Sequence, residues 1–324
     1  MDSRPTDHLR QLDWDTLLEP LHELEDCSIC PRDCHADRTS DKLGFCKSGV
    51  GFAVSSIFAH MGEEPVLSGT RGICNIFFLH CNMQCVYCQN YQISRNREAT
   101  AEDTDSFIGI IRTIEKHLER GVPSVGFVSP SHFVPQVRVI MNMLRARGHD
   151  PVFVYNTNGY DRTETIASLE EQVDVYLPDL KYMDDSLARR LSDTPRYVEI
   201  ATSALKEMYR QRGPNIFLRD DNTIERGMII RHLVLPGQVD NSKAVLRFIA
   251  DELSPAVHVS LMSQYHPNPF VAADPDLGRT LTADEYEDVL DEFRRLGFYR
   301  GWVQELDSPS HYLPDFMKEE PFSE

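Results

Sequence analysis

Apolar residues of this chain alternate between two patterns from Ile73 onward. Short continuous apolar runs, typical of buried strands, are separated by longer stretches in which apolar residues recur every three to four positions, typical of helices. The expected strands lie at 73–79, 125–128, 152–155, 173–177, 228–235 and 257–262, with a terminal strand at 299–305. The expected helices lie around 108–118, 137–144, 198–208, 245–249 and 285–293. We interpret these helical stripes as core-facing surfaces.

Six β/α units in series predict an α/β fold with a parallel sheet and right-handed crossovers. The pattern alone allows an open doubly wound sheet or a partial barrel. Residues 1–24 are amphipathic, and residues 25–72 are expected to be irregular. We divide the chain into a Cys-rich metal-binding extension (1–70), the α/β domain (71–306) and an acidic, Pro-containing tail (307–324) that we expect to be mobile.

Length and composition allow a sizeable core, because the 324 residues are 41% hydrophobic. No apolar run reaches the roughly 18 residues of a membrane span, and the polar N-terminus lacks a signal-peptide core. We therefore expect a cytoplasmic protein that does not enter a membrane. The formal net charge of −18 argues against a nucleic-acid partner, which needs clustered Lys and Arg.

The eight cysteines form two tight groups and one outlier. They are Cys27, Cys30, Cys34, Cys46, Cys74, Cys81, Cys85 and Cys88. In a cytoplasmic chain of this length, such grouping favours metal binding over disulfides.

The second group follows the first expected strand with the spacing C-x3-C-x2-C, at Cys81, Cys85 and Cys88. An iron–sulfur cubane usually takes four thiolates, so three in one loop leave one iron open for chemistry. The alternative is a zinc knuckle that also uses Cys74. Zinc ligands usually come as separated pairs, so this spacing favours the cluster.

With the aromatic Tyr87 before its third cysteine, this motif resembles the hallmark of radical S-adenosylmethionine (SAM) enzymes. Further segments resemble the glycyl-radical-enzyme activating enzymes in the right order: 155–160, 178–184, 230–237 and Tyr265-His266. The segments 30–34, 60–65, 68–70 and 88–94 resemble a narrower group of pyruvate formate-lyase activating enzyme-like proteins.

The resemblance implies a partial (β/α)6 TIM-like barrel with a Cys-rich N-terminal extension. It also implies a [4Fe-4S] cluster on Cys81, Cys85 and Cys88, whose fourth iron is chelated by SAM. One electron would cleave SAM to a 5′-deoxyadenosyl radical, which abstracts hydrogen from a substrate. The implied partners are a flavodoxin or ferredoxin as electron donor and a glycyl radical enzyme as one candidate substrate.

Matched positions have implied roles in cofactor binding. Tyr87 and Gln89 would flank the adenine. Asn156 and Asn158 would reach the ribose or the SAM carboxylate. Asp179 and Lys181 would line the same mouth, and His266 would lie near the adenosyl group.

Some of these residues have simpler interpretations. Asp179 and Lys181 could be a local surface pair, His266 a turn residue, and Cys74 a small hydrophobe in the core. The chain also departs from the family: Ser129 and its neighbours replace the usual Gly-Gly-Glu segment, and Asn156 replaces an Asp of the activating enzymes.

The first cysteine group, Cys27-x2-Cys30-x3-Cys34-x11-Cys46, supplies four thiolates within twenty residues. Four ligands close a site, so we expect a structural or electron-transferring role. Zinc and a second iron–sulfur cluster both remain compatible with this spacing.

Three functions compete at this point. The first is a radical SAM enzyme, acting on a glycyl radical enzyme or on another substrate. The second is a non-enzymatic iron–sulfur or zinc redox module, which would not need polar residues at every strand end. The third, a zinc-dependent nucleic-acid binder, conflicts with the negative charge.

Overall fold

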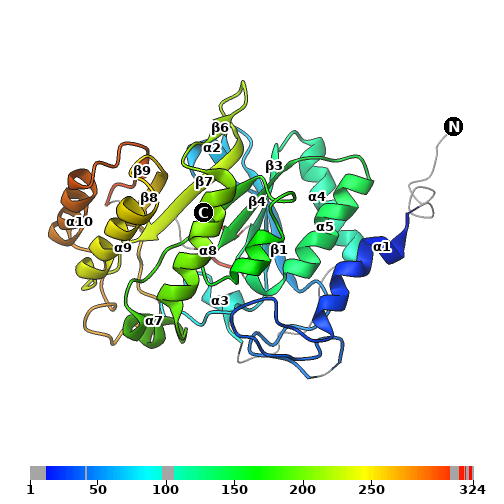
Figure 1. Ribbon diagram of the computed structural model, residues 1–324, viewed down its shortest axis with the longest axis horizontal. Helices are drawn as coiled ribbons and strands as arrows, with labels where there is room; N and C mark the ends of the chain where they lie inside the picture. Colours follow the sequence, from blue (N-terminus) through cyan, green and yellow to red (C-terminus); the bar gives the residue numbers. More distant parts are fainter. Residues whose placement is uncertain are drawn as a thin grey trace.

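The computed structural model describes residues 12–40, 42–96, 106–306, 314–316, 318 and 321–322. Its centre is one sheet whose strands pair in chain order (Figure 1). The strands are β1 (Val54–His60), β2 (Ile73–Phe78), β3 (Ser124–Val128), β4 (Val152–Thr157), β5 (Val175–Pro178), β7 (Ile224–Leu233), β8 (His258–Met262) and β9 (Gly301–Val303). The short β6 (Phe217–Leu218) pairs with β7 alone.

The strands from β2 to β9 on this path pair in parallel, and β1 joins the edge of β2 antiparallel. A doubly wound sheet reverses its strand order at a switch point, whereas this order never reverses. Right-handed crossovers then all place their helices on one side, and the sheet curls around its other side. The fold is therefore the expected partial (β/α)6 barrel.

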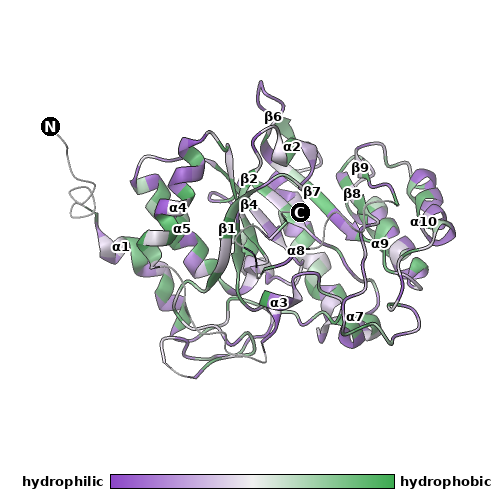
Figure 2. Cartoon of the chain, turned by 180° about the vertical axis from the view of Figure 1, so that it is seen from behind, coloured by the Kyte–Doolittle hydropathy of each residue, from purple (hydrophilic) through white to green (hydrophobic). Residues whose placement is uncertain are grey.

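The helices lie outside the sheet in Figure 1. They are α4 (Phe107–Glu119), α5 (Val134–Ala146), α6 (Thr163–Ala167), α7 (Asp185–Ser192), α8 (Tyr197–Arg212), α9 (Val239–Glu252) and α10 (Ala283–Arg295). Five of them match the expected helical stripes. Figure 2 shows the reason: the strands are largely apolar, and each long helix has an apolar and a polar side.

The segment before Ile73 is more regular than expected. It contains β1 and the short helix α2 (Pro65–Ser68). The strand was missed because serines interrupt its apolar residues. Leu67 of α2 is buried in a small apolar cluster with Val152 and Ile229, so this segment packs onto the barrel. The sheet thus begins before residue 71, while the three-part division of the chain stays a prediction.

Both ends of the chain are described only in part. Residues 1–11 of the amphipathic N-terminal stretch lie outside the described residues, and the rest forms α1 (Trp14–Leu18) and η2 (Glu19–Leu24). Of the tail, the ring of Phe316 lies 5.3 Å from that of Phe77, and the ring of Phe322 lies 4.4 Å from that of His60. These described parts of the tail pack against β1 and β2.

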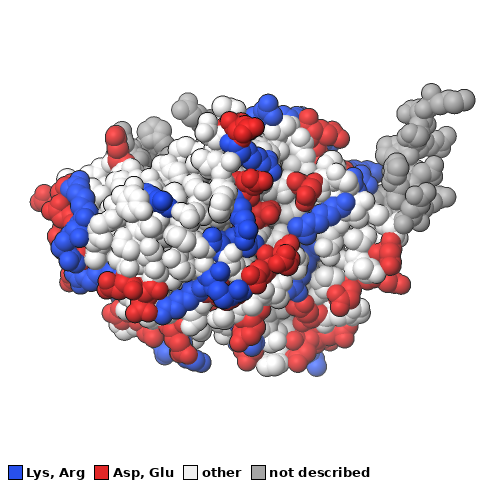
Figure 3. All heavy atoms as spheres, turned by 45° about the horizontal axis from the view of Figure 1, so that its top comes forward, with Lys and Arg blue, Asp and Glu red and all other residues white. Residues whose placement is uncertain are grey.

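On the face in Figure 3, Lys and Arg side chains are interleaved with Asp and Glu. Among the described residues, no helix has the length and apolar character needed to cross a membrane.

Candidate active site and second cysteine site

A cavity of about 400 Å³ occupies the inside of the barrel and reaches the loop that follows β2. Cys81, Cys85 and Cys88 all line it. So do two neighbours of these cysteines in sequence and five predicted residues from the ends of β3, β4 and β5: Tyr87, Gln89, Ser129, Asn156, Asn158, Asp179 and Lys181. The carboxyl ends of parallel strands meet at one end of a barrel, which explains why residues so far apart in sequence meet here.

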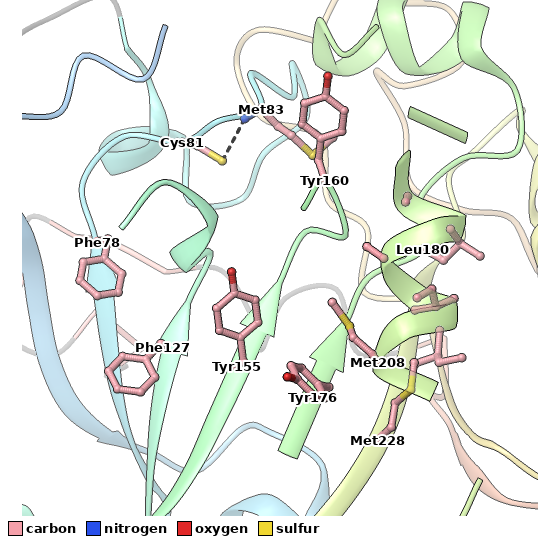
Figure 4. Packing of buried hydrophobic residues seen from close by; sticks show 14 of the residues in the cluster. Phe78, Cys81, Met83, Phe127, Tyr155, Tyr160, Tyr176, Leu180, Met208 and Met228 are labelled. Carbon is pink, nitrogen blue, oxygen red and sulfur yellow. Dashed lines mark hydrogen bonds between the residues drawn. The ribbon is translucent and has the colours of Figure 1, made fainter. Parts of the chain in front are cut away.

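Hydrogen-bond donors surround the three sulfurs. The Met83 amide lies 3.3 Å from Cys81 Sγ (Figure 4), and Asn158 Nδ2 lies 3.4 Å from the same sulfur. Ser192 Oγ lies 3.0 Å from Cys85 Sγ. Donors aimed at sulfur stabilise thiolates, and they are among the groups that tune a bound cluster.

Ser94 makes the corresponding contact to the third sulfur, at 3.3 Å from Cys88 Sγ. Asn268 holds the loop itself, because its Nδ2 donates to the carbonyls of Val86 and Cys88 at 2.9 and 3.1 Å. The loop is thus tied to the segment after β8.

Burial raises the pKa of the Cys81 thiol to about 12 and that of Cys85 to about 11. Free thiols at these positions would hold their protons at neutral pH, and a metal would have to displace them. Among the described residues, no three His, Cys, Asp or Glu side chains gather as a single metal ion would require. A cubane instead binds each thiolate on a different iron, and the three sulfurs with their donors fit that group.

Tyr87 and Gln89 are both anchored. The Tyr87 hydroxyl lies 2.6 Å from that of Tyr182, and Gln89 Nε2 donates to the Gln264 carbonyl at 2.9 Å. Ser129 has a left-handed backbone (φ 50°), and its amide donates to the Asn156 carbonyl at 2.8 Å.

Asp179 and Lys181 form an ion pair of 2.5 Å between Oδ2 and Nζ. Their side chains are only 22% and 17% exposed, so the pair is not a solvated surface pair. Burial, the largest single effect, would lower the pKa of Lys181, but Asp179, Cys85 and Tyr197 together outweigh it and the pKa is raised. The lysine therefore stays charged inside the cavity mouth.

His266 and Cys74 both lie outside the cavity lining. His266 is not among the residues that line the cavity, and its Nδ1 lies 3.1 Å from the Pro267 carbonyl. Cys74 is fully buried in the main core, where it packs as a small hydrophobe. Burial raises its pKa to about 12.

The N-terminal cysteines gather around a second, small cavity. Cys27, Cys30, Cys34 and Cys46 all line it. The Phe45 amide lies 3.3 Å from Cys34 Sγ. A Cβ at Gly44 would lie 3.0 Å from the same sulfur, so the backbone at Gly44 passes close to the Cys34 side chain. Burial also raises the pKa of Cys30. The four cysteines therefore share one cavity, although no three of their side chains gather as a single metal ion would require.

The two cysteine sites are joined by direct hydrogen bonds. Arg32, between Cys30 and Cys34, donates from Nε to the carbonyl of Asn82 at 2.8 Å. Asn96 donates from Nδ2 to the carbonyls of Phe45 and Cys81 at 3.0 and 2.9 Å. The N-terminal extension therefore supports the loop that carries the first cysteine of the active-site motif.

Several of these contact residues were not predicted as site residues. Ser94 is six residues from Cys88, so proximity to the motif was a usable signal. Ser192 and Asn268 are 107 and 180 residues from their cysteine partners, and no local pattern marks them.

The fold and the cavity define a partial-barrel protein with a three-cysteine loop at the carboxyl end of its first parallel strand. The sequence matches the radical SAM superfamily over residues 75–249. An uncharacterised protein of Methanocaldococcus jannaschii is 30% identical over 271 residues, which cover 82% of this chain and 74% of that protein. The chain belongs to the radical SAM superfamily, which implies an enzyme that uses a [4Fe-4S] cluster and SAM.

Solved structures with similarity include a domain of a pyruvate-formate lyase-activating enzyme from Bacteroides vulgatus, at 16% identity and a TM-score of 0.38. The match covers 53% of this chain and 93% of the domain. The structure of a methylornithine synthase is 12% identical to this chain, with a TM-score of 0.47. The match covers 91% of this chain and 72% of the synthase chain.

Proposed function

We propose that Cys81, Cys85 and Cys88 hold the [4Fe-4S] cluster and that SAM binds beside it in the same cavity. The observation that carries the proposal is that these cysteines share one cavity with polar residues from the ends of three successive strands. When bound, the cluster and SAM supply a 5′-deoxyadenosyl radical that abstracts hydrogen from a substrate.

The chain's own residues orient and shield that chemistry. Lys181, kept charged by Asp179, is placed to meet a carboxylate at the cavity mouth. Asn156, Asn158 and Ser129 offer neutral polar contacts for the ribose and amino acid parts of SAM. Tyr87 and Gln89 lie next to the cysteines for the adenine. His266 stays a prediction for the adenosyl group.

We further propose that a flavodoxin or ferredoxin supplies the electron, in the cytoplasm. A glycyl radical enzyme is one candidate substrate, supported by the activating-enzyme-like segments at the strand ends. A second metal centre on Cys27, Cys30, Cys34 and Cys46, with zinc or an iron–sulfur cluster, has a structural or electron-transferring role.

A small-molecule substrate is the second candidate. Trp302 of β9 and Phe322 of the tail line the cavity at the open side of the partial barrel. A volume of about 400 Å³ is near the lower end of the roughly 300–1,000 Å³ of small-molecule sites. SAM must share that volume, which favours a compact substrate.

The test is formation of 5′-deoxyadenosine by anaerobically reconstituted protein with dithionite and SAM. Cys85→Ala should abolish product, whereas Cys74→Ala, which removes a core cysteine, should retain it. Absence of product from protein that holds a reducible cluster would instead support the non-enzymatic redox module. A glycyl radical signal in electron paramagnetic resonance (EPR), after addition of a glycyl radical enzyme, would distinguish the first candidate substrate from the second.

A further inference from the structure

The cavity carries a second charged cluster, centred on Arg231 of β7, whose backbone pairs with that of Asp179 directly after the neighbouring strand β5. Arg231 of β7 donates from Nε to Glu64 Oε1 at 2.8 Å and from Nη2 to Glu64 Oε2 at 2.5 Å. The same Nη2 also donates to Glu63, whose second oxygen accepts from Asn75 Nδ2 at 2.7 Å. All three charged side chains line the cavity.

Chain direction places the two glutamates at the end of the barrel opposite the cysteines. β1 runs antiparallel to β2, so His60 pairs with Ile73, the first residue of β2. The segment between them therefore crosses the amino end of β2, whereas the cysteine loop follows its carboxyl end. Leu67 in this segment is buried against apolar side chains of β4 and β7. It therefore helps to close the barrel at the amino ends of the strands.

The cluster has one more negative than positive charge. The side chains of Glu63, Glu64 and Arg231 are only 9%, 5% and 13% exposed. Burial, the largest single effect, would raise the pKa of Glu63, but the charge and hydrogen bond of Arg231, together with His60 and Asn75, outweigh it. The pKa is therefore lowered, and this carboxylate is ionised. The other charged pair that lines the cavity, Asp179 and Lys181, is balanced. An unbalanced buried charge is costly unless a bound group neutralises it.

His60 does not supply the missing positive charge. It is only 9% exposed and lines the same cavity. Burial lowers its pKa, so the ring is neutral. Its ring centre lies 6.0 Å from that of Phe58 and 4.4 Å from that of Phe322. A buried imidazole that lines the same cavity as the two carboxylates offers a further polar group to a ligand.

We propose that the substrate is a small molecule with a cationic amino group, which binds against Glu63 and Glu64 at the closed end of the cavity. An ammonium would balance the extra carboxylate and occupy acceptor positions that Arg231 and Asn75 leave free. Trp302 and Phe322 line the same cavity, and aromatic rings attract cations. This inference rests on the proposed function, since the radical at the other end would act on the molecule held here.

The test uses reconstituted protein with SAM present and two probes, 1,4-diaminobutane and succinate. Ligand-observed saturation-transfer NMR should show binding of the diamine and none of succinate. In Glu63→Gln the diamine should bind about tenfold more weakly, as expected when a charge-assisted hydrogen bond is lost. Glu64→Gln should act in the same direction. Glu225→Gln, at an exposed position on β7, should bind the diamine as the parent protein does.

Binding of succinate in place of the diamine, or diamine binding unchanged in both variants, would overturn the proposal. The comparison of the two probes needs no variant, so it holds even if the glutamine variants fold poorly. Formation of 5′-deoxyadenosine in the same parent preparation separates the two hypotheses. Product without diamine binding refutes the amine substrate alone. No product from protein that holds a reducible cluster refutes the enzyme assignment.

Discussion

Ser192 Oγ lies 3.0 Å from Cys85 Sγ, although 107 residues separate the two in sequence. The same hydroxyl lies 2.6 Å from that of Tyr182, which in turn lies 2.6 Å from that of Tyr87. A chain of hydroxyl groups thus connects one proposed cluster ligand with a residue proposed to flank the adenine. We therefore predict that the last residue of α7 tunes the reduction potential of the proposed cluster.

Ser192→Ala should lower the reduction potential of the cluster, because a hydrogen bond to sulfur stabilises the more negative, reduced state. The expected shift is on the order of 50 mV, about tenfold in the one-electron equilibrium. An EPR-monitored redox titration measures it. Ser186→Ala, on the same helix but exposed, should leave the potential unchanged. An equal shift in both variants would show that the helix, and not this hydroxyl, sets the potential.

Arg32→Ala should loosen the active-site loop. Besides its bond to Asn82, Arg32 donates to the Asp193 carbonyl at 2.7 Å, and its guanidinium lies 3.5 Å from the centre of the Phe45 ring. Loss of these contacts should cost about 2–3 kcal/mol of stability. The cluster should then lose iron to a chelator severalfold faster. The absorbance of the iron–chelator complex measures this rate. Arg294→Ala, which removes an exposed ion-pair partner, is the control, and an equal rate in the two would contradict the coupling.

Glu285→Gln should remove an acid-sensitive contribution to stability. Hydrogen bonds from Arg279, the largest cause, lower the pKa of Glu285 from 4.5 to about 2, although burial opposes the shift. A lowered pKa in the folded state stabilises the protein above pH 4.5, and this contribution is lost as the pH falls toward 2.

The carboxylate also completes a capping box with Thr282 at the start of α10. We therefore expect the variant to lose about 1–2 kcal/mol at neutral pH. Urea unfolding at neutral pH and near pH 3 measures the effect. The difference between variant and parent should shrink in acid, and a constant difference would refute the assignment of the pH dependence to this carboxyl.

Gly126→Ala should disturb Glu63 indirectly, because Gly126 of β3 lies beside Asn75 of β2. A Cβ at this position would collide with Asn75 Oδ1, and Asn75 holds Glu63. Displacing this buried side chain should cost about 1–3 kcal/mol. The melting temperature should fall, and the diamine should bind less tightly. At Gly51 nothing lies within 4 Å of an added Cβ, so Gly51→Ala should match the parent protein.

Much of the architecture followed from local pattern. The apolar runs located the parallel strands, because a strand buried on both faces must be apolar throughout. β1 was missed because an edge strand with polar positions lacks that signature. The cysteine spacing marked the loop that we propose to hold the cluster, since three ligands of one cluster must come close together in any fold that binds it.

The sequence by itself determined the order of the β/α units, the loop with Cys81, Cys85 and Cys88, and membership of the superfamily, since each rests on residues close together in the chain. Only the tertiary structure decided that Arg231 meets Glu64 across 167 residues, that Ser192 reaches Cys85 and that the N-terminal extension supports the active-site loop. The physical reason is that such contacts depend on how the strands curl and on which side chains share the barrel interior, and no periodicity along the chain encodes them.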